Sequence, residues 1–190
     1  MATDGEINKH QGASRWTLVI WGTAALLLSV PFFAMRFTSE VNWTAADFLI
    51  MGVMLGLACG AIELVVRLSG NWAYRFAVAA AVAGAFLVTW ANLPVGHEHT
   101  PYDYPFYLAL LVGLVGSAIA RLRPKGMMAA MLATAAALIV ALRLLMVHEA
   151  DAEGGNLLVT AVASAAIASP FLISAWLFRK ASRTQVCSKP

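Results

Sequence analysis

Six long apolar runs constrain what this chain can fold into more than any other feature of its sequence. Each run is close to the length of about 20 helical residues that crosses a hydrocarbon core of about 30 Å. The runs lack the period of two and the turn spacing of barrel strands, and they are rich in Ala, Leu and Gly, so each predicts a helix. Their approximate ranges are 16–37, 45–68, 73–95, 104–120, 127–147 and 157–178.

The composition of the chain agrees with a membrane location. With 61% hydrophobic and only 12% charged residues, the sequence lies outside the range of soluble globular proteins. We therefore predict an all-α membrane protein, in which a bundle of six transmembrane helices spans residues 16–178. Residues 1–15 are expected to form a flexible cytoplasmic tail, and residues 179–190 a basic cytoplasmic tail.

Charged residues predict the orientation, since Lys and Arg are retained on the cytoplasmic side of a membrane. With both termini inside, the cytoplasmic segments hold 11 of the 13 basic residues, namely Lys9, Arg15, Arg67, Arg75, Arg121, Arg123, Lys125, Arg179, Lys180, Arg183 and Lys189. Seven of the ten acids lie in or beside the outer loops, namely Glu40, Asp47, Glu98, Asp103, Glu149, Asp151 and Glu153. The net charge of +3 follows from this topology, and no nucleic-acid partner is implied.

Four stretches stand out beyond their hydropathy: VNWTAADFLIMG, IELVVRLSGNWAYRFAV, FLVTWANLPVG and GLVGSAIARLRPKGMMAAMLATAAALIVAL. Over about residues 41–142, they resemble a family of uncharacterised small bacterial multi-helix inner-membrane proteins. The resemblance implies the same fold and a bacterial inner-membrane location, and it adds no activity. The chain departs from the family pattern after Gly96, where it reads HEHTPYDYP, so no role of these histidines is carried over.

Small residues predict where helices pack. Gly52, Gly56 and Gly60 recur every four residues and so share one face of the second expected helix. In lipid, such a face lets another backbone approach closely and gain dispersion contacts. We interpret it as a helix-packing seam, and Gly113 with Ser117 offers a similar face on the fourth helix. A glycine-lined pathway for a small solute is the less favoured alternative.

Glu63 is the acid that lies well inside an apolar run, and an ionisable group at membrane depth is a functional candidate. Arg67 follows four residues later, on the same helix face. We interpret the two residues as an ion pair about one turn from the cytoplasmic end of the helix. A proton relay is the alternative, and it requires further polar partners.

The stretch NLPVGHEHTPYDYP places His97 and His99 between two apolar runs. A glycine and a proline bracket these histidines, which would point to the same side of an extended segment. The last outer loop follows His148 and Glu149. Three imidazoles and a carboxylate suit a divalent ion such as zinc, copper or nickel, so we hypothesise a metal site formed by all four residues. The alternatives are a solvated polar loop or a pH-sensitive one.

Three classes of function fit these features. The favoured one is a non-catalytic accessory, sensor or assembly component, whose acidic, histidine-bearing outer face binds a divalent metal or a partner, a second copy included. The alternative is a small secondary transporter or channel, which normally has polar groups near the midplane and broken helices. A membrane enzyme with an outer-face metal site ranks third, because the sequence shows no cofactor motif and no nucleophile paired with a base. No catalytic residue is assigned.

Overall fold

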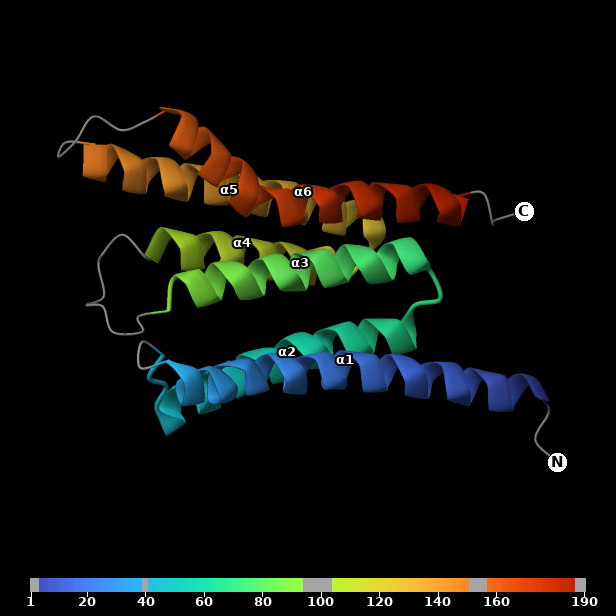
Figure 1. The fold of residues 1–190 in the computed structure, drawn as a ribbon. Helices are drawn as coiled ribbons and strands as arrows, with labels where there is room; N and C mark the ends of the chain where they lie inside the picture. Colours follow the sequence, from blue (N-terminus) through green and yellow to red (C-terminus); the bar gives the residue numbers. More distant parts are fainter. Residues whose placement is uncertain (1–3, 39–40, 94–103, 151–156, 187–190) are drawn as a thin grey trace. The chain divides into compact units, whose positions relative to one another are not determined.

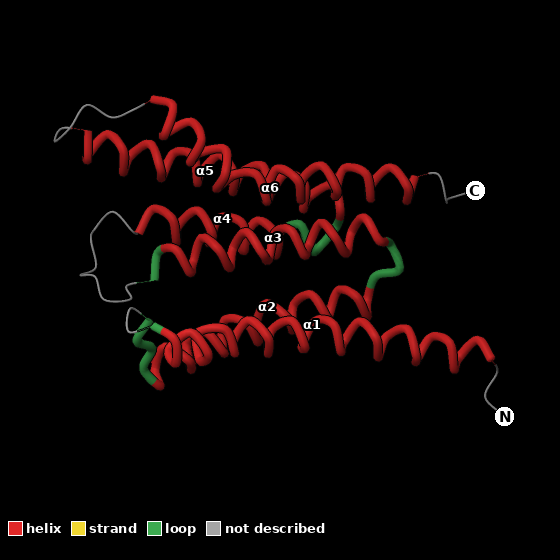
Figure 2. Tube along the Cα trace, viewed as in Figure 1, coloured by secondary structure: helices red, strands yellow, loops and turns green. Residues whose placement is uncertain are grey.

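The computed structural model describes residues 4–38, 41–93, 104–150 and 157–186, with 4–15, 147–150, 157, 159–160 and 184–186 described by their backbone alone. Over the described residues the chain is all helical, with six helices and no strand (Figure 1, Figure 2). The helices are α1 (Asp4–Phe37), α2 (Ala45–Leu68), α3 (Trp72–Ala91), α4 (Tyr104–Ile119), α5 (Pro124–Ala150) and α6 (Leu157–Val186).

Five of the described helices contain a stretch that is long and apolar enough to cross a membrane. These stretches are Trp16–Phe37, Ala45–Leu68, Trp72–Ala91, Pro124–Met146 and Ala161–Arg183. The sequence predicted a sixth span, but α4 has only 16 residues. At about 1.5 Å per residue it covers about 24 Å, which is shorter than a hydrocarbon core of about 30 Å. The multi-pass membrane class is therefore supported, with five long spans among the described helices.

The helices α1 and α6 extend by two turns or more beyond the apolar runs that predicted them. α1 begins at Asp4 rather than at Trp16, so the backbone of residues 4–15 is helical where we expected a flexible tail. α6 continues to Val186, past the expected end at Phe178. The added stretches carry acids near the start of α1 and bases near the end of α6, and both placements complement the helix dipole.

The chain divides into two compact units, Met1–Gly70 and Asn71–Pro190. The first unit contains α1 and α2, and the second contains α3 to α6. The single domain that we expected over residues 16–178 thus contains two units. α1 pairs with α2 in the first unit, and α5 pairs with both α4 and α6 in the second, as expected for helices that follow one another in the sequence.

Local signals in the sequence set the start of α2. The Thr44 hydroxyl oxygen accepts a hydrogen bond from the Asp47 backbone N–H at 3.3 Å, and the Asp47 carboxylate accepts one from the Thr44 backbone N–H at 2.7 Å. This reciprocal pair is a capping box, which satisfies two N–H groups at the helix end. Trp43 packs edge-to-face on Phe48 with ring centroids 5.3 Å apart, a hydrophobic staple that fixes where the chain enters the helix.

The core of the second unit lies between α3, α5 and α6. α5 packs against α4 and α6, and α3 packs mainly against α6. Asn71 caps α3, because its side-chain oxygen accepts hydrogen bonds from the backbone N–H groups of Ala73 and Tyr74 at 2.9 and 3.4 Å. The side chains of Leu138 in α5 and Phe178 in α6 are fully buried. Apolar burial therefore joins these helices.

Glycines let helices of the second unit approach closely. A Cβ atom built on Gly113 of α4 would lie 2.5 Å from Oγ1 of Thr134 in α5. One built on Gly84 of α3 would lie 2.8 Å from the Cβ of Pro170 in α6. Real Cβ atoms essentially never come closer than 3.0 Å to such neighbours. Both positions therefore need glycine where these helices meet.

Candidate functional site

The residues predicted to bind a metal fall at the edge of what the structure describes. His97 and His99 lie outside the described residues. His148 and Glu149 belong to the last turn of α5, where the backbone alone is described. Among the described side chains, no group of three or more His, Cys, Asp or Glu could hold a metal ion. The four-residue metal site therefore stays a prediction.

The structure nevertheless brings together the helix ends from which these residues extend. The Tyr107 hydroxyl in the first turn of α4 donates a hydrogen bond of 2.7 Å to the carbonyl oxygen of Asn92, which caps the end of α3. α5 returns along α4 after a short turn, so it ends on the side where α4 begins. Figure 1 shows these ends and the start of α6 on one side of the second unit. The end of α5, which contains His148, thus lies on the side where α3 ends and α4 begins.

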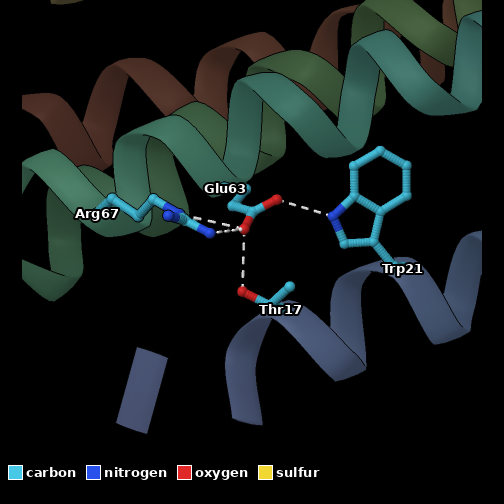
Figure 3. Close-up of polar contacts among 4 residues, drawn as sticks. All are labelled: Thr17, Trp21, Glu63 and Arg67. Atoms are coloured by element: carbon cyan, nitrogen blue, oxygen red, sulfur yellow. Dashed lines mark hydrogen bonds and ion pairs between the residues drawn. The ribbon is translucent and has the colours of Figure 1, made fainter. Parts of the chain in front are cut away.

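A second candidate site lies in the first unit, where side chains of both helices bind Glu63 of α2 (Figure 3). The Glu63 carboxylate accepts hydrogen bonds from Thr17 Oγ1 at 3.0 Å and from Trp21 Nε1 at 2.7 Å, both on α1. Arg67 donates to the same carboxylate from Nε at 3.1 Å and forms an ion pair with it through Nη2. The Glu63–Arg67 pair predicted from their spacing is confirmed. We call these four residues the Glu63 clamp.

The carboxylate of the Glu63 clamp accepts four hydrogen bonds. Oε2 accepts from Trp21, while Oε1 accepts from Thr17 and twice from Arg67. A carboxylate has about four lone-pair sites, two on each oxygen, so Oε1 is fully used while Oε2 keeps one site. The Glu63 side chain is only 15% exposed, whereas Arg67 is 62% exposed. The hydrogen bonds from Thr17 and Trp21 therefore hold α1 against α2, and Arg67 pairs with the charge of the carboxylate.

Thr17 and Trp21 are the members of the clamp that sequence reasoning missed. They lie four residues apart, so they share one face of α1 just as Glu63 and Arg67 share one face of α2. A hydroxyl and an indole N–H at that spacing inside an apolar run are the signal that could have found them, because a buried Trp N–H usually finds an acceptor.

The expected packing seam of α2 has little contact with α1. A Cβ atom on Gly52 would lie 4.0 Å from Leu28 Cδ2, which is an ordinary contact distance. Within the first unit, α1 brings no described atom within 4 Å of a Cβ placed on Gly56 or Gly60. The use of all three glycines as a seam therefore stays a prediction, and it concerns a helix other than α1.

Comparison with known proteins gives no relative from which a function could be assigned. No protein-family model, no curated protein and no solved structure matches the chain. The family resemblance expected over residues 41–142 therefore stays a prediction as well. Function must be inferred from the chemistry and the placement of the side chains.

Proposed function

We propose that this chain is a non-catalytic, multi-pass protein of the bacterial inner membrane that acts as an accessory, sensor or assembly component. Both termini lie in the cytoplasm, and the outer face binds a divalent metal ion through His97, His99, His148 and Glu149. The membrane class rests on the five long apolar helices. The bound metal ion, the location in the bacterial inner membrane and the cytoplasmic termini are what we propose beyond that class.

The observation that carries the metal proposal is that α5 ends on the side of the second unit where α3 ends and α4 begins. Tyr107 of α4 is hydrogen-bonded to the end of α3, so the connection that contains His97 and His99 starts and ends close together. The last turn of α5, with His148 and Glu149, points to that side too (Figure 1). Imidazoles and a carboxylate from the α3–α4 connection and from the last turn of α5 match the mixed N and O ligands of zinc and related ions.

The charge distribution of the second unit supports the orientation. α3 begins, α4 turns into α5 and α6 ends on the side opposite the end of α5 (Figure 1). The basic residues concentrate there, namely Arg75, Arg121, Arg123, Lys125, Arg179, Lys180 and Arg183. Retention of Lys and Arg in the cytoplasm then places the histidine side outside.

The Glu63 clamp favours a component over a transporter. Transporters place ionisable groups where they face substrate or relay protons. Glu63 instead binds Thr17 and Trp21 of the neighbouring helix together with Arg67, one turn further along its own helix. Its hydrogen bonds join two helices of one unit, which is a structural task.

Metal analysis on the detergent-purified full chain tests the proposal. We expect a stoichiometric divalent ion after titration with zinc, copper or nickel and removal of the excess. The His97→Ala/His99→Ala variant should lose that ion, because two of three imidazole ligands are gone. His10→Ala is the matched control, since it removes the one remaining histidine, which lies near the N-terminus. Equal metal content in the double variant and the wild type would refute the site.

A further inference from the structure

The turn between α4 and α5 contains two residues whose backbone is left-handed. Arg121 has a φ of 48° and Leu122 a φ of 57°, and in the described part of the chain they are the residues other than glycine with a positive φ. This conformation brings the Cβ atom too close to the following carbonyl oxygen, so it is strained for residues other than glycine. The Leu122 side chain is 56% exposed, so its burial does not offset the strain. Other contacts must hold the turn in this form.

The end of α4 accounts for the first of the two left-handed residues. The Arg121 N–H donates a hydrogen bond of 3.0 Å to the Ala118 carbonyl oxygen, and the Leu122 N–H donates one of 3.3 Å to that of Ser117. These are the two hydrogen bonds of a Schellman motif, in which glycine usually occupies the position of Arg121. The motif requires a left-handed backbone at Arg121, and it does not require one at Leu122.

The chain has little room to reverse its direction by another route. A Cβ atom built on Gly126 would lie 2.5 Å from the Cβ of Ala120, so the end of α4 and the start of α5 approach closely. Pro124 begins α5 and disfavours a helical conformation for Arg123. The reversal therefore depends on the two left-handed residues, and relief of strain has to occur at them.

A hydroxyl group from another helix binds the second left-handed residue. The Tyr74 hydroxyl in α3 donates a hydrogen bond of 2.8 Å to the Leu122 carbonyl oxygen, across 48 positions of the chain. The φ and ψ angles of Leu122 set the direction of this carbonyl group. The hydrogen bond and the left-handed conformation of Leu122 therefore depend on each other.

α6 fixes the position of the Tyr74 ring. Phe178 of α6 is fully buried and packs edge-to-face on Tyr74, with ring centroids 5.1 Å apart. One turn earlier, the Ser174 hydroxyl donates a hydrogen bond of 2.7 Å to the carbonyl oxygen of Ala77 in α3. A continuous series of contacts thus leads from α6 through α3 to the turn.

We propose that Tyr74 is the latch of a turn with two conformations. In the closed form its hydroxyl binds the Leu122 carbonyl oxygen, and the left-handed backbone is retained. In the open form this hydrogen bond is broken and Leu122 relaxes to a negative φ. The strain of one left-handed residue and the net worth of one hydrogen bond are of the same order, so the two forms lie close in free energy. The latch couples the packing of α3 on α6 to the conformation of an exposed basic turn.

Hydrogen exchange of the full chain in detergent tests the latch, with mass spectrometry that resolves the N–H groups of the turn. In the closed form the Arg123 N–H donates a hydrogen bond of 2.9 Å to the Ala120 carbonyl oxygen, which relaxation of Leu122 would break. One hydrogen bond is worth about fivefold in an equilibrium constant, so Tyr74→Phe should speed exchange of this N–H about fivefold. Leu122→Gly should slow it about fivefold after correction for intrinsic rates, because glycine adopts the left-handed form without strain.

Tyr107→Phe is the matched control. The Tyr107 hydroxyl donates a hydrogen bond of 2.7 Å to the carbonyl oxygen of Asn92 at the other end of α3, so this variant deletes an equivalent bond away from the turn. Both tyrosine variants keep the aromatic ring, and the ring at position 74 can still pack on Phe178. Both variants should therefore stay folded, which circular dichroism checks.

Each result supports or overturns the latch. Faster exchange in Tyr74→Phe but not in Tyr107→Phe, reversed when Leu122→Gly is added, supports it. Unchanged exchange in Tyr74→Phe would mean that the hydroxyl does not hold the turn, and equal acceleration in both tyrosine variants would mean a general loosening of the unit. Either result overturns the proposal. Leu122→Gly tests it without altering Tyr74, and exchange no slower than in the wild type would show that the turn stores no strain.

Discussion

In the first unit, α1 meets α2 through a carboxylate that accepts hydrogen bonds from both helices, whereas in the second unit α4 meets α5 where Gly113 leaves room for Thr134. Lipid gives no hydrophobic drive for helices to associate, so close packing and interhelical hydrogen bonds must supply the attraction. At these two contacts, each unit uses one of these sources. A substitution that adds volume should therefore damage the second unit, and one that removes a polar group should damage the first.

The largest effect is expected from Gly113→Ala. The new Cβ would lie 2.5 Å from Oγ1 of Thr134, whose side chain is fully buried and cannot move aside into free space. Overpacking of this kind typically costs about 1 to 3 kcal/mol, so we expect the free energy of unfolding to fall by about 2 kcal/mol. Unfolding in SDS, followed by circular dichroism, measures the change.

A double-mutant cycle tests whether Thr134 is the cause. Thr134→Ala removes the atom that Gly113→Ala would strike, so the second substitution should cost much less in that background. An equal cost of Gly113→Ala with and without Thr134 would mean that the close approach of α4 and α5 is not what holds them together.

Glu63→Ala should have the next largest effect, and it acts on the first unit. It removes the hydrogen bonds to Thr17 and Trp21 together with the ion pair to Arg67. Interhelical hydrogen bonds in membrane proteins are worth about 0.6 kcal/mol on average and up to about 1.7 kcal/mol, so we expect a loss of about 1.5 kcal/mol in unfolding free energy. The same SDS titration measures it.

Trp21→Phe serves as the control for the clamp. It removes one hydrogen bond of 2.7 Å while keeping an aromatic ring, so a smaller loss is expected than for Glu63→Ala. Because both substitutions delete the same contact, their combination should cost less than the sum of the single losses. Fully additive losses would show that Trp21 contributes through packing alone.

The smallest expected change is a gain from Gly56→Ala. A Cβ at this position meets no atom of α1 within 4 Å. Glycine inside a helix costs about 0.5 to 1 kcal/mol relative to alanine, so the substitution should raise the unfolding free energy by about 0.5 kcal/mol. A loss of stability, or a change of oligomeric mass by light scattering, would show that another helix uses the seam formed by Gly52, Gly56 and Gly60. The contrast between the two units would then break down.

The helices could be predicted from the sequence because burial in lipid needs length and apolarity, and both are visible in single runs. The true ends of α1 and α6 were missed, since residues 4–15 and 179–186 are polar and their helical backbone extends beyond the apolar signal. The sequence also does not indicate the division into two compact units at Gly70. This division depends on which helices touch, and six similar apolar runs do not specify their neighbours.

The candidate sites show the same limit. The spacing of Glu63 and Arg67 was sufficient to predict their ion pair, because both lie on one helix. The hydrogen bonds from Thr17 and Trp21 depend on how α1 is rotated about its axis, which no periodicity within one run specifies. Glycines illustrate the point again. The regular series in α2 is the more conspicuous pattern, yet tight contacts between helices occur at Gly84 and Gly113 of the second unit.

The hydrogen bond from Ser174 to Ala77 has a consequence for the order of assembly during synthesis. The two residues are 97 positions apart, and α3 packs mainly on α6, which is made after α4 and α5. Translation at about 5 to 20 residues per second leaves α3 without its main partner for about 5 to 20 s. During that interval Ala77 and Gly84 face lipid or another protein. The second unit therefore completes its core only when α6 inserts, and a nascent chain stopped before α6 has no stable version of this fold.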